Sequence, residues 1–172
     1  MSEPRYLIDT SVFIQADKAY YSFGVCPGFW EGLIALHRQG RVLSIDRVYD
    51  EICFGDEDEL TNWAKISMPS NFFAKSNAPE VVKWYGAIQT WANAEPQFFP
   101  AVKAAFADET DAWIVAYAGA YNLTVVTGEV YSATVKNKIP IPNICRAKNF
   151  QVNCIDIFAM LARLRIQFVL KQ

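Results

Sequence analysis

The segment Arg5–Gln15 reads RYLIDTSVFIQ, and it decides the fold. A short apolar run ends at Asp9, two hydroxyl residues follow, and a second apolar run begins. The first run is short and bounded by polar residues, which predicts a buried strand, and a helix is expected from about Ser11. A carboxylate at this point either caps the helix or belongs to a metal site. The choice depends on whether other acids occupy comparable positions.

Three further segments have the same strand-like character: Arg41–Ile45, Leu123–Thr127 and Gln151–Ile155. Helical patterns occupy residues 28–40, 46–52, 78–92, 108–121 and 155–166. Strands that are apolar throughout and alternate with helices indicate a parallel sheet covered on both faces. The sequence therefore predicts an α/β fold with a central, mainly parallel sheet between two helical layers. A length of 172 residues suits one domain, expected to span residues 1–172.

The composition indicates a folded globular protein, because 52% of the residues are hydrophobic. No apolar stretch reaches the ~18 residues that cross a bilayer, and the first residues, MSEPRY, do not resemble a signal peptide. We therefore expect a cytoplasmic protein without a membrane partner. The spacing of the four cysteines fits neither a redox pair nor a zinc site, so they are expected to be reduced and structural.

Four acids are predicted at one end of the sheet. Asp9 and Glu129 follow predicted strands, Glu51 lies one turn into the helix after Arg41–Ile45, and Asp111 lies in line with the core-facing positions of its helix. In open parallel sheets the functional groups gather at the carboxyl ends of the strands. The sequence therefore predicts that these four carboxylates converge.

Each acid also has a structural explanation. Asp9 can cap its helix, Asp108 and Asp111 have the spacing of a capping box, and Glu51 and Glu129 suit a solvated helix face and a turn. Taken together, four carboxylates at one sheet end repel one another unless a cation neutralises them. Oxygen ligands without nitrogen or sulfur partners favour Mg²⁺ or Mn²⁺ over zinc.

The charge of the chain is unevenly distributed. Residues 1–129 carry 17 acids and nine bases, whereas residues 130–172 carry one acid and seven bases. The basic residues of segment 130–172 either form a surface that binds the phosphates of a nucleic acid or lie on a solvated helix surface. The candidate cations are Lys136, Lys138, Arg146, Lys148, Arg163 and Arg165. Trp30, Tyr20 and Tyr21 can stack on unpaired bases, although core packing is the better interpretation for these three.

The ordered motifs resemble a known family. LIDTSVFI, VYDEI, DAWIVAYA and VVTGE, which begin at residues 7, 48, 111 and 125, resemble the four motifs of PIN domains, and KIPIPNIC resembles a bacterial branch of PIN-like proteins. The resemblance implies a three-layer Rossmann-like fold and a metal-dependent nuclease. It also implies that Asp9, Glu51, Asp111 and Glu129 are catalytic and bind Mg²⁺ or Mn²⁺, with Asp108 as a further metal-binding candidate. Many PIN domains have aspartate at the fourth position, where this chain has glutamate.

The resemblance further implies hydrolysis of RNA phosphodiester bonds by the toxin component of a toxin–antitoxin pair, with an antitoxin protein and a second copy of the chain as partners. Thr10 and Ser11 then orient a carboxylate, contact a phosphate oxygen or hold the start of the helix. The predicted nucleic-acid contacts are Lys136, Lys138, Arg146 and Lys148. The alternatives are a nuclease that acts on DNA and a binding module without catalysis.

Phosphotransfer folds also place an aspartate after the first strand. An aspartyl phosphatase needs a second aspartate two residues later, where this chain has Ser11, and a receiver domain needs an acid pair where only Glu3 is available. Both are disfavoured.

Overall fold

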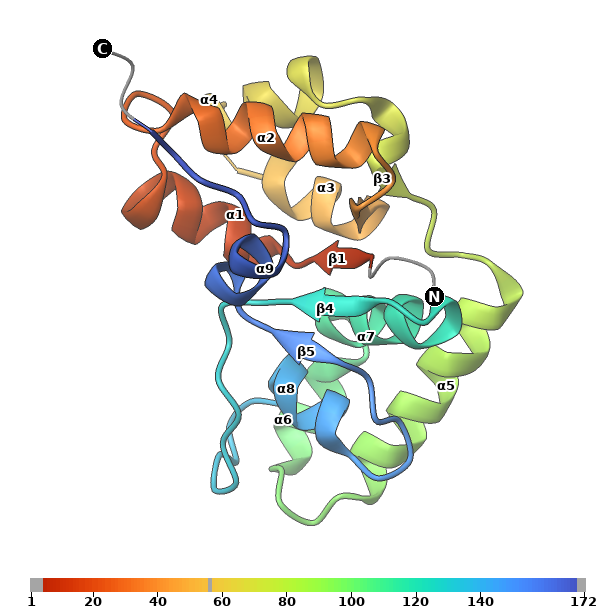
Figure 1. The fold of residues 1–172 in the computed structure, drawn as a ribbon. Helices are drawn as coiled ribbons and strands as arrows, with labels where there is room; N and C mark the ends of the chain where they lie inside the picture. Colours follow the sequence, from red (N-terminus) through yellow and green to blue (C-terminus); the bar gives the residue numbers. More distant parts are fainter. Residues whose placement is uncertain (1–4, 56, 170–172) are drawn as a thin grey trace.

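The computed structural model describes residues 5–55 and 57–169 and contains a five-stranded sheet (Figure 1). The strands are β1 (Tyr6–Ile8), β2 (Val42–Ile45), β3 (Phe73–Ala74), β4 (Thr124–Val126) and β5 (Cys154–Ile155). Their order is β3-β2-β1-β4-β5, and every neighbouring pair is parallel. The four predicted strands are therefore confirmed, and β3 was not predicted.

The helices lie on both sides of the sheet (Figure 1). They are α1 (Thr10–Gln15), α2 (Pro27–Arg38), α3 (Asp46–Cys53), α4 (Glu59–Asn62), α5 (Pro79–Ala94), α6 (Pro100–Phe106), α7 (Thr110–Tyr121), α8 (Ile141–Arg146) and α9 (Ile157–Arg163). Single π-helical turns at Ala16–Tyr20 and Trp63–Ser67 extend α1 and α4, and Ser70–Phe72 forms a 3₁₀ turn. The predicted α/β fold with a parallel central sheet is confirmed. The sequence did not predict α4, α6 or α8.

The core surrounds the central strands and α7. Strands β1 and β4 are buried along their whole length, as is most of α7, including Ile114, Val115 and Ala118. Because α7 packs on α5, α8 and β4, it is apolar on most of its surface. Asp111 therefore stands at the start of a helix that is otherwise inside the protein.

No helix among the described residues has the length and hydropathy required to span a bilayer. All four cysteines are free thiols, and Cys145 is buried in the core.

The contact between α5 and α7 depends on Gly119. A Cβ atom at this position would lie 2.4 Å from the Trp84 ring, which is closer than real Cβ contacts allow. We expect Gly119→Ala to lower the free energy of unfolding by about 1–3 kcal/mol, because the indole must move within a packed interface. Thermal unfolding should record a fall in Tm of about 2–4 °C per kcal/mol.

Gly86 provides the matched control for this prediction, because it lies in α5 and a Cβ atom added there would point into open space. Gly86→Ala should stabilise the protein by about 0.5–1 kcal/mol, since alanine loses less backbone entropy in a helix. Equal effects of the two substitutions would contradict the close packing of α5 on α7.

The strand order reverses direction between β1 and β4. From β1 the chain crosses through α2 to β2 on one side, whereas from β4 it crosses through α8 to β5 on the other. Connections that diverge from two neighbouring strands leave a crevice at their carboxyl ends, where ligands bind in folds of this kind. Asp9 directly follows β1, and Thr127 directly follows β4. We call this end of the sheet the carboxyl edge.

Candidate active site

Asp9 is the most deeply buried acid at the carboxyl edge, with 3% of its surface exposed. Its Oδ2 accepts hydrogen bonds from Ser11 Oγ (2.5 Å) and Thr127 Oγ1 (2.9 Å). Although Asp9 precedes α1, its side chain makes no capping hydrogen bond, so the capping interpretation is wrong. Burial raises the pKa of Asp9, the two hydroxyl donors oppose this shift, and the charge of Glu129 adds to it.

Hydroxyl groups join the segment after β1 to the segment after β4. Ser11 Oγ accepts a hydrogen bond from the Gly128 N–H (3.0 Å), and Thr127 Oγ1 accepts one from the Glu129 N–H (3.1 Å). A Cβ atom on Gly128 would lie 2.3 Å from the Gln15 amide, so this segment also presses against α1. Ser11 therefore hydrogen-bonds to a carboxylate, which is one of the three roles considered for it, and its contact with phosphate stays a prediction.

Glu51 reaches the carboxyl edge from α3. It is exposed, whereas Val48 one turn earlier is buried, and Thr10 Oγ1 donates a hydrogen bond to Glu51 Oε2. Because Thr10 directly follows Asp9, this hydrogen bond connects the second predicted acid to the first. Thr10 is thus the second hydroxyl residue that orients a carboxylate.

Asp111 lies in the first turn of α7 among other charges. Burial and the nearby charges of Glu129 and Asp9 raise its pKa from 3.8 to about 8, and the positive charge of Lys138 opposes the shift. Asp9, Asp111 and Glu129 therefore lie close enough to interact electrostatically. The predicted capping box is wrong, because Glu109 precedes the helix in place of Asp108 and no side chain caps it.

Sequence reasoning missed Glu109 at this site. Burial raises the pKa of Glu109, as do the charges of Glu129 and Glu51, while Lys138 lowers it. Its neighbour Asp108 is exposed and lines a separate hollow beside Glu51. The sequence signal for this site was the acidic segment Asp108–Asp111. The helix was expected to start one residue too early, so Asp108 was chosen from this segment in place of Glu109.

Glu129 is bound to two groups of its own segment. Its Oε2 accepts a hydrogen bond from the Ile141 N–H (2.7 Å), and its Oε1 pairs with the Lys138 ammonium. Burial by itself lowers the pKa of Lys138, but the hydrogen bond to Glu129 and the charges of Glu129, Asp111 and Glu109 raise it overall. Lys138 therefore supplies a positive charge to the acids, and its contact with nucleic acid stays a prediction.

We define the acid cluster as Asp9, Glu51, Glu109, Asp111 and Glu129. Its carboxylate oxygens suit Mg²⁺ or Mn²⁺ chemically. However, within residues 5–55 and 57–169 no three His, Cys, Asp or Glu side chains are arranged to hold one metal ion. Hydroxyl, amide and ammonium groups hold Asp9, Glu51 and Glu129. The carboxylate oxygens thus suit a divalent cation as ligands. To coordinate one, these three carboxylates would exchange their present hydrogen-bond and ion-pair partners for the metal ion.

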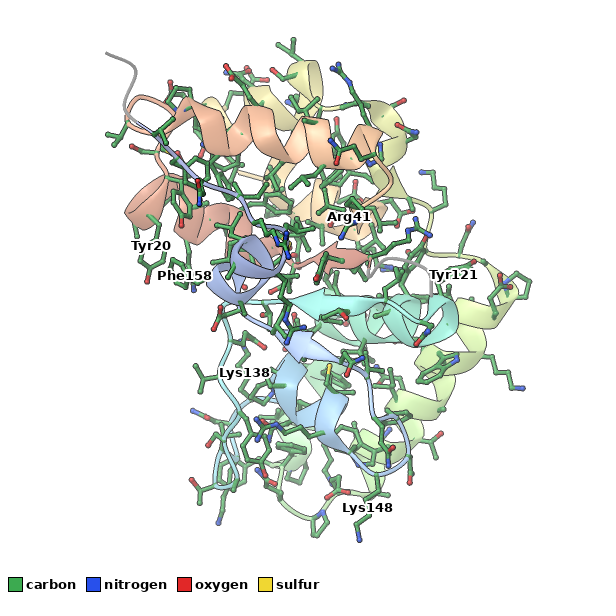
Figure 2. The ribbon with its side chains drawn as sticks, in the orientation of Figure 1. Tyr20, Arg41, Tyr121, Lys138, Lys148 and Phe158 are labelled. Atoms are coloured by element: carbon green, nitrogen blue, oxygen red, sulfur yellow. The ribbon has the colours of Figure 1, made fainter. Side chains whose placement is uncertain are left out.

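The other predicted nucleic-acid contacts among the basic residues are Lys136, Arg146 and Lys148. Lys136 is exposed, and Arg146 lies over the Tyr131 ring with its Cζ 4.4 Å from the ring centroid. Lys148 projects from the connection between α8 and β5, well away from Lys138 (Figure 2).

The aromatic candidates divide between core and surface. Trp30 is buried and Tyr21 stacks on Phe29 at 4.6 Å, which confirms core packing for these two. Tyr20 is exposed and forms an edge-to-face pair with Phe158, with ring centroids 5.2 Å apart, between α1 and α9 (Figure 2). Of the three, only Tyr20 is largely available to a ligand.

Comparison with curated proteins finds no match for the chain. A family model described as a domain of unknown function, DUF4411, matches residues 6–168. The match includes the whole sheet and every member of the acid cluster. The chain therefore belongs to the DUF4411 family.

Proposed function

We propose that this protein is a metal-dependent endoribonuclease that hydrolyses RNA phosphodiester bonds at the acid cluster. The supporting observation is that carboxylates from separate segments lie close enough at the carboxyl edge to shift one another's pKa. Asp9 and Glu129 follow β1 and β4, Glu51 belongs to α3, Glu109 directly precedes α7, and Asp111 lies in its first turn. Burial is the largest cause of the raised pKa of Asp111, and the charges of Glu129, Asp9 and Glu109 raise it further. A cluster of acids that is costly without a cation is the arrangement expected of a divalent-metal site.

Asp9, Glu51 and Asp111 would hold Mg²⁺ or Mn²⁺, with Glu129 as a fourth acid. Such an ion, when bound, lowers the pKa of a water molecule and stabilises the leaving oxygen of the phosphodiester. The chain itself positions the carboxylates: Ser11 and Thr127 fix Asp9, and Thr10 fixes Glu51. The Lys138 ammonium offsets part of the negative charge that would otherwise repel a phosphate.

The resemblance to PIN domains, whose members are nucleases, and the basic character of residues 130–172 support RNA as the substrate. A toxin role with an antitoxin partner and a homodimer belongs to the same proposal, and it rests on the resemblance alone.

The decisive experiment incubates the wild-type protein with labelled single-stranded RNA and with duplex DNA, in Mg²⁺, Mn²⁺ or EDTA. We expect RNA cleavage in either metal and at least about a 100-fold lower rate in EDTA, because metal ions contribute several kcal/mol to such reactions. Cleavage that is unchanged in EDTA would contradict the metal site. Cleavage of DNA alone would overturn the RNA assignment, and binding without cleavage would favour a non-catalytic module.

A further inference from the structure

A hollow borders the acid cluster on the side of α3. Its lining residues are Arg47, Asp50, Glu51, Phe54, Asp108 and Thr110. Glu51 belongs both to this hollow and to the acid cluster, and Thr110 and Asp108 flank Glu109. A ligand in the hollow would therefore lie directly beside the proposed site of cleavage.

Arg47 brings a positively charged guanidinium to the hollow. Its guanidinium lies over the Trp113 ring, with Cζ 4.0 Å from the centroid, and Trp113 stacks on Tyr85 with 4.0 Å between ring centroids. Tyr85 is fixed in turn by a hydrogen bond from its hydroxyl to the Ala107 carbonyl (2.6 Å). The Arg47 Nε is buried and has no hydrogen-bond partner in the described part of the chain. A buried donor without a partner is rare, and the guanidinium has further N–H groups that can donate to a ligand with an acceptor.

Phe54 brings an exposed aromatic ring to the same hollow. It follows the last turn of α3, and 93% of its surface is exposed. Such a ring contributes almost nothing to the core, but it offers a face for stacking a flat ligand.

The acids in the hollow restrict the class of ligand. Asp50, Glu51 and Asp108 would repel a phosphate, whereas a neutral nucleobase with donor groups can hydrogen-bond to carboxylates. Guanine presents adjacent N1–H and N2–H donors, and its O6 and N7 atoms accept hydrogen bonds from arginine. It thus complements both kinds of group in the hollow and can stack on Phe54.

We propose that this hollow binds an unpaired guanine base of the RNA substrate and so selects where the strand is cut. Asp50 and Asp108 accept hydrogen bonds from the base, the Arg47 guanidinium donates to it, and Phe54 stacks on it. This inference rests on the proposed function, because it assigns a subsite to the same nuclease.

The test uses neutral nucleosides without metal, so that binding is measured apart from cleavage. Guanosine, adenosine, cytidine and uridine are titrated into the full chain, and the indole NMR signal of Trp113 is followed, with Trp113→Phe used to assign it. We expect guanosine to shift this signal and to bind about fivefold or more tightly than the other three. Phe54→Ala should weaken guanosine binding about fivefold or more, because stacking on an exposed ring is lost.

Phe99→Ala is the matched control, since Phe99 is also an exposed phenylalanine but lies at the start of α6, outside the hollow. It should leave guanosine binding unchanged. Asp50→Asn should reduce the preference for guanosine, because the amide replaces one of the two acceptor oxygens of Asp50 with a donor that opposes the N–H groups of the base. Equal binding of all four nucleosides, or no shift of Trp113, would overturn the proposal.

The two proposals fail in different ways. If guanosine binds as expected but no RNA is cut, the nuclease assignment fails and the hollow remains a nucleobase site. If RNA is cut without preference for positions near guanine, and guanosine does not bind, the nuclease stands and the subsite is wrong.

Discussion

Asp9→Asn should lower the rate of metal-dependent RNA cleavage by about 100-fold or more, which corresponds to the loss of several kcal/mol of stabilisation by the metal. Asparagine has nearly the shape of aspartate, and its remaining oxygen can still accept a hydrogen bond from Ser11 or Thr127. The fold should therefore survive, because the substitution also removes a buried carboxylate whose pKa is raised by burial. What is lost is the negative charge that attracts a divalent cation.

The measurement compares initial cleavage rates of wild-type and variant protein on the same labelled RNA over a range of Mn²⁺ concentrations. Glu31→Gln serves as the control, because Glu31 is an exposed acid on α2 outside the acid cluster. Circular dichroism and thermal unfolding establish that both variants are folded. Undiminished cleavage by the folded Asp9→Asn protein would remove Asp9 from the mechanism.

Asp111→Asn should stabilise the metal-free protein at pH 8 while it abolishes cleavage. In the wild type the pKa of Asp111 is about 8 in the folded state against 3.8 as the ordinary value, so the folded protein holds a proton that the unfolded chain has lost. Stability from this group is fully present below about pH 4 and is lost as the pH rises to about 8. The slope can reach about 1.4 kcal/mol per pH unit in this window. Asparagine does not titrate, so its contribution is constant.

Urea unfolding at several pH values between 4 and 9 in EDTA provides the measurement. Asp9 and Glu109 also have raised pKa values and act in the same direction, so only the difference between wild type and variant isolates Asp111. We expect this difference to grow with pH up to about 8 in favour of the variant. Saturating Mn²⁺ should reverse the order, because a bound metal stabilises only the protein that retains the carboxylate. Stability curves that run parallel at all pH values would contradict the raised pKa.

The fold was largely predictable because its strongest signals are local. β1, β2 and β4 are short apolar runs, and α2, α5 and α7 are long periodic segments. β3 has only two residues and pairs with β2 alone, so no pattern marks it. The segment Lys138–Arg146 contains two prolines, which hid α8, although proline is favourable at the start of a helix.

The positions of the acids in the fold were predictable, but their contacts were not. The positions of Asp9, Glu51, Asp111 and Glu129 follow from strand ends and helix phase, which are properties of the sequence. The pairing of Glu129 with Lys138 and the hydroxyl contacts of Asp9 depend on how distant side chains meet. Glu109 was missed for the same reason, since a shift of one residue in the helix start decides which acid faces the site.

The hydroxyl contacts between the segments after β1 and β4 have a consequence for partial unfolding. Hydrogen bonds among Ser11, Thr127 and Gly128 hold Asp9 against the ends of two buried strands, β1 and β4. Regions with the most buried contacts are the last to open, whereas peripheral helices and loops open at little cost. The outer helices can therefore fray without moving Asp9 relative to these strands.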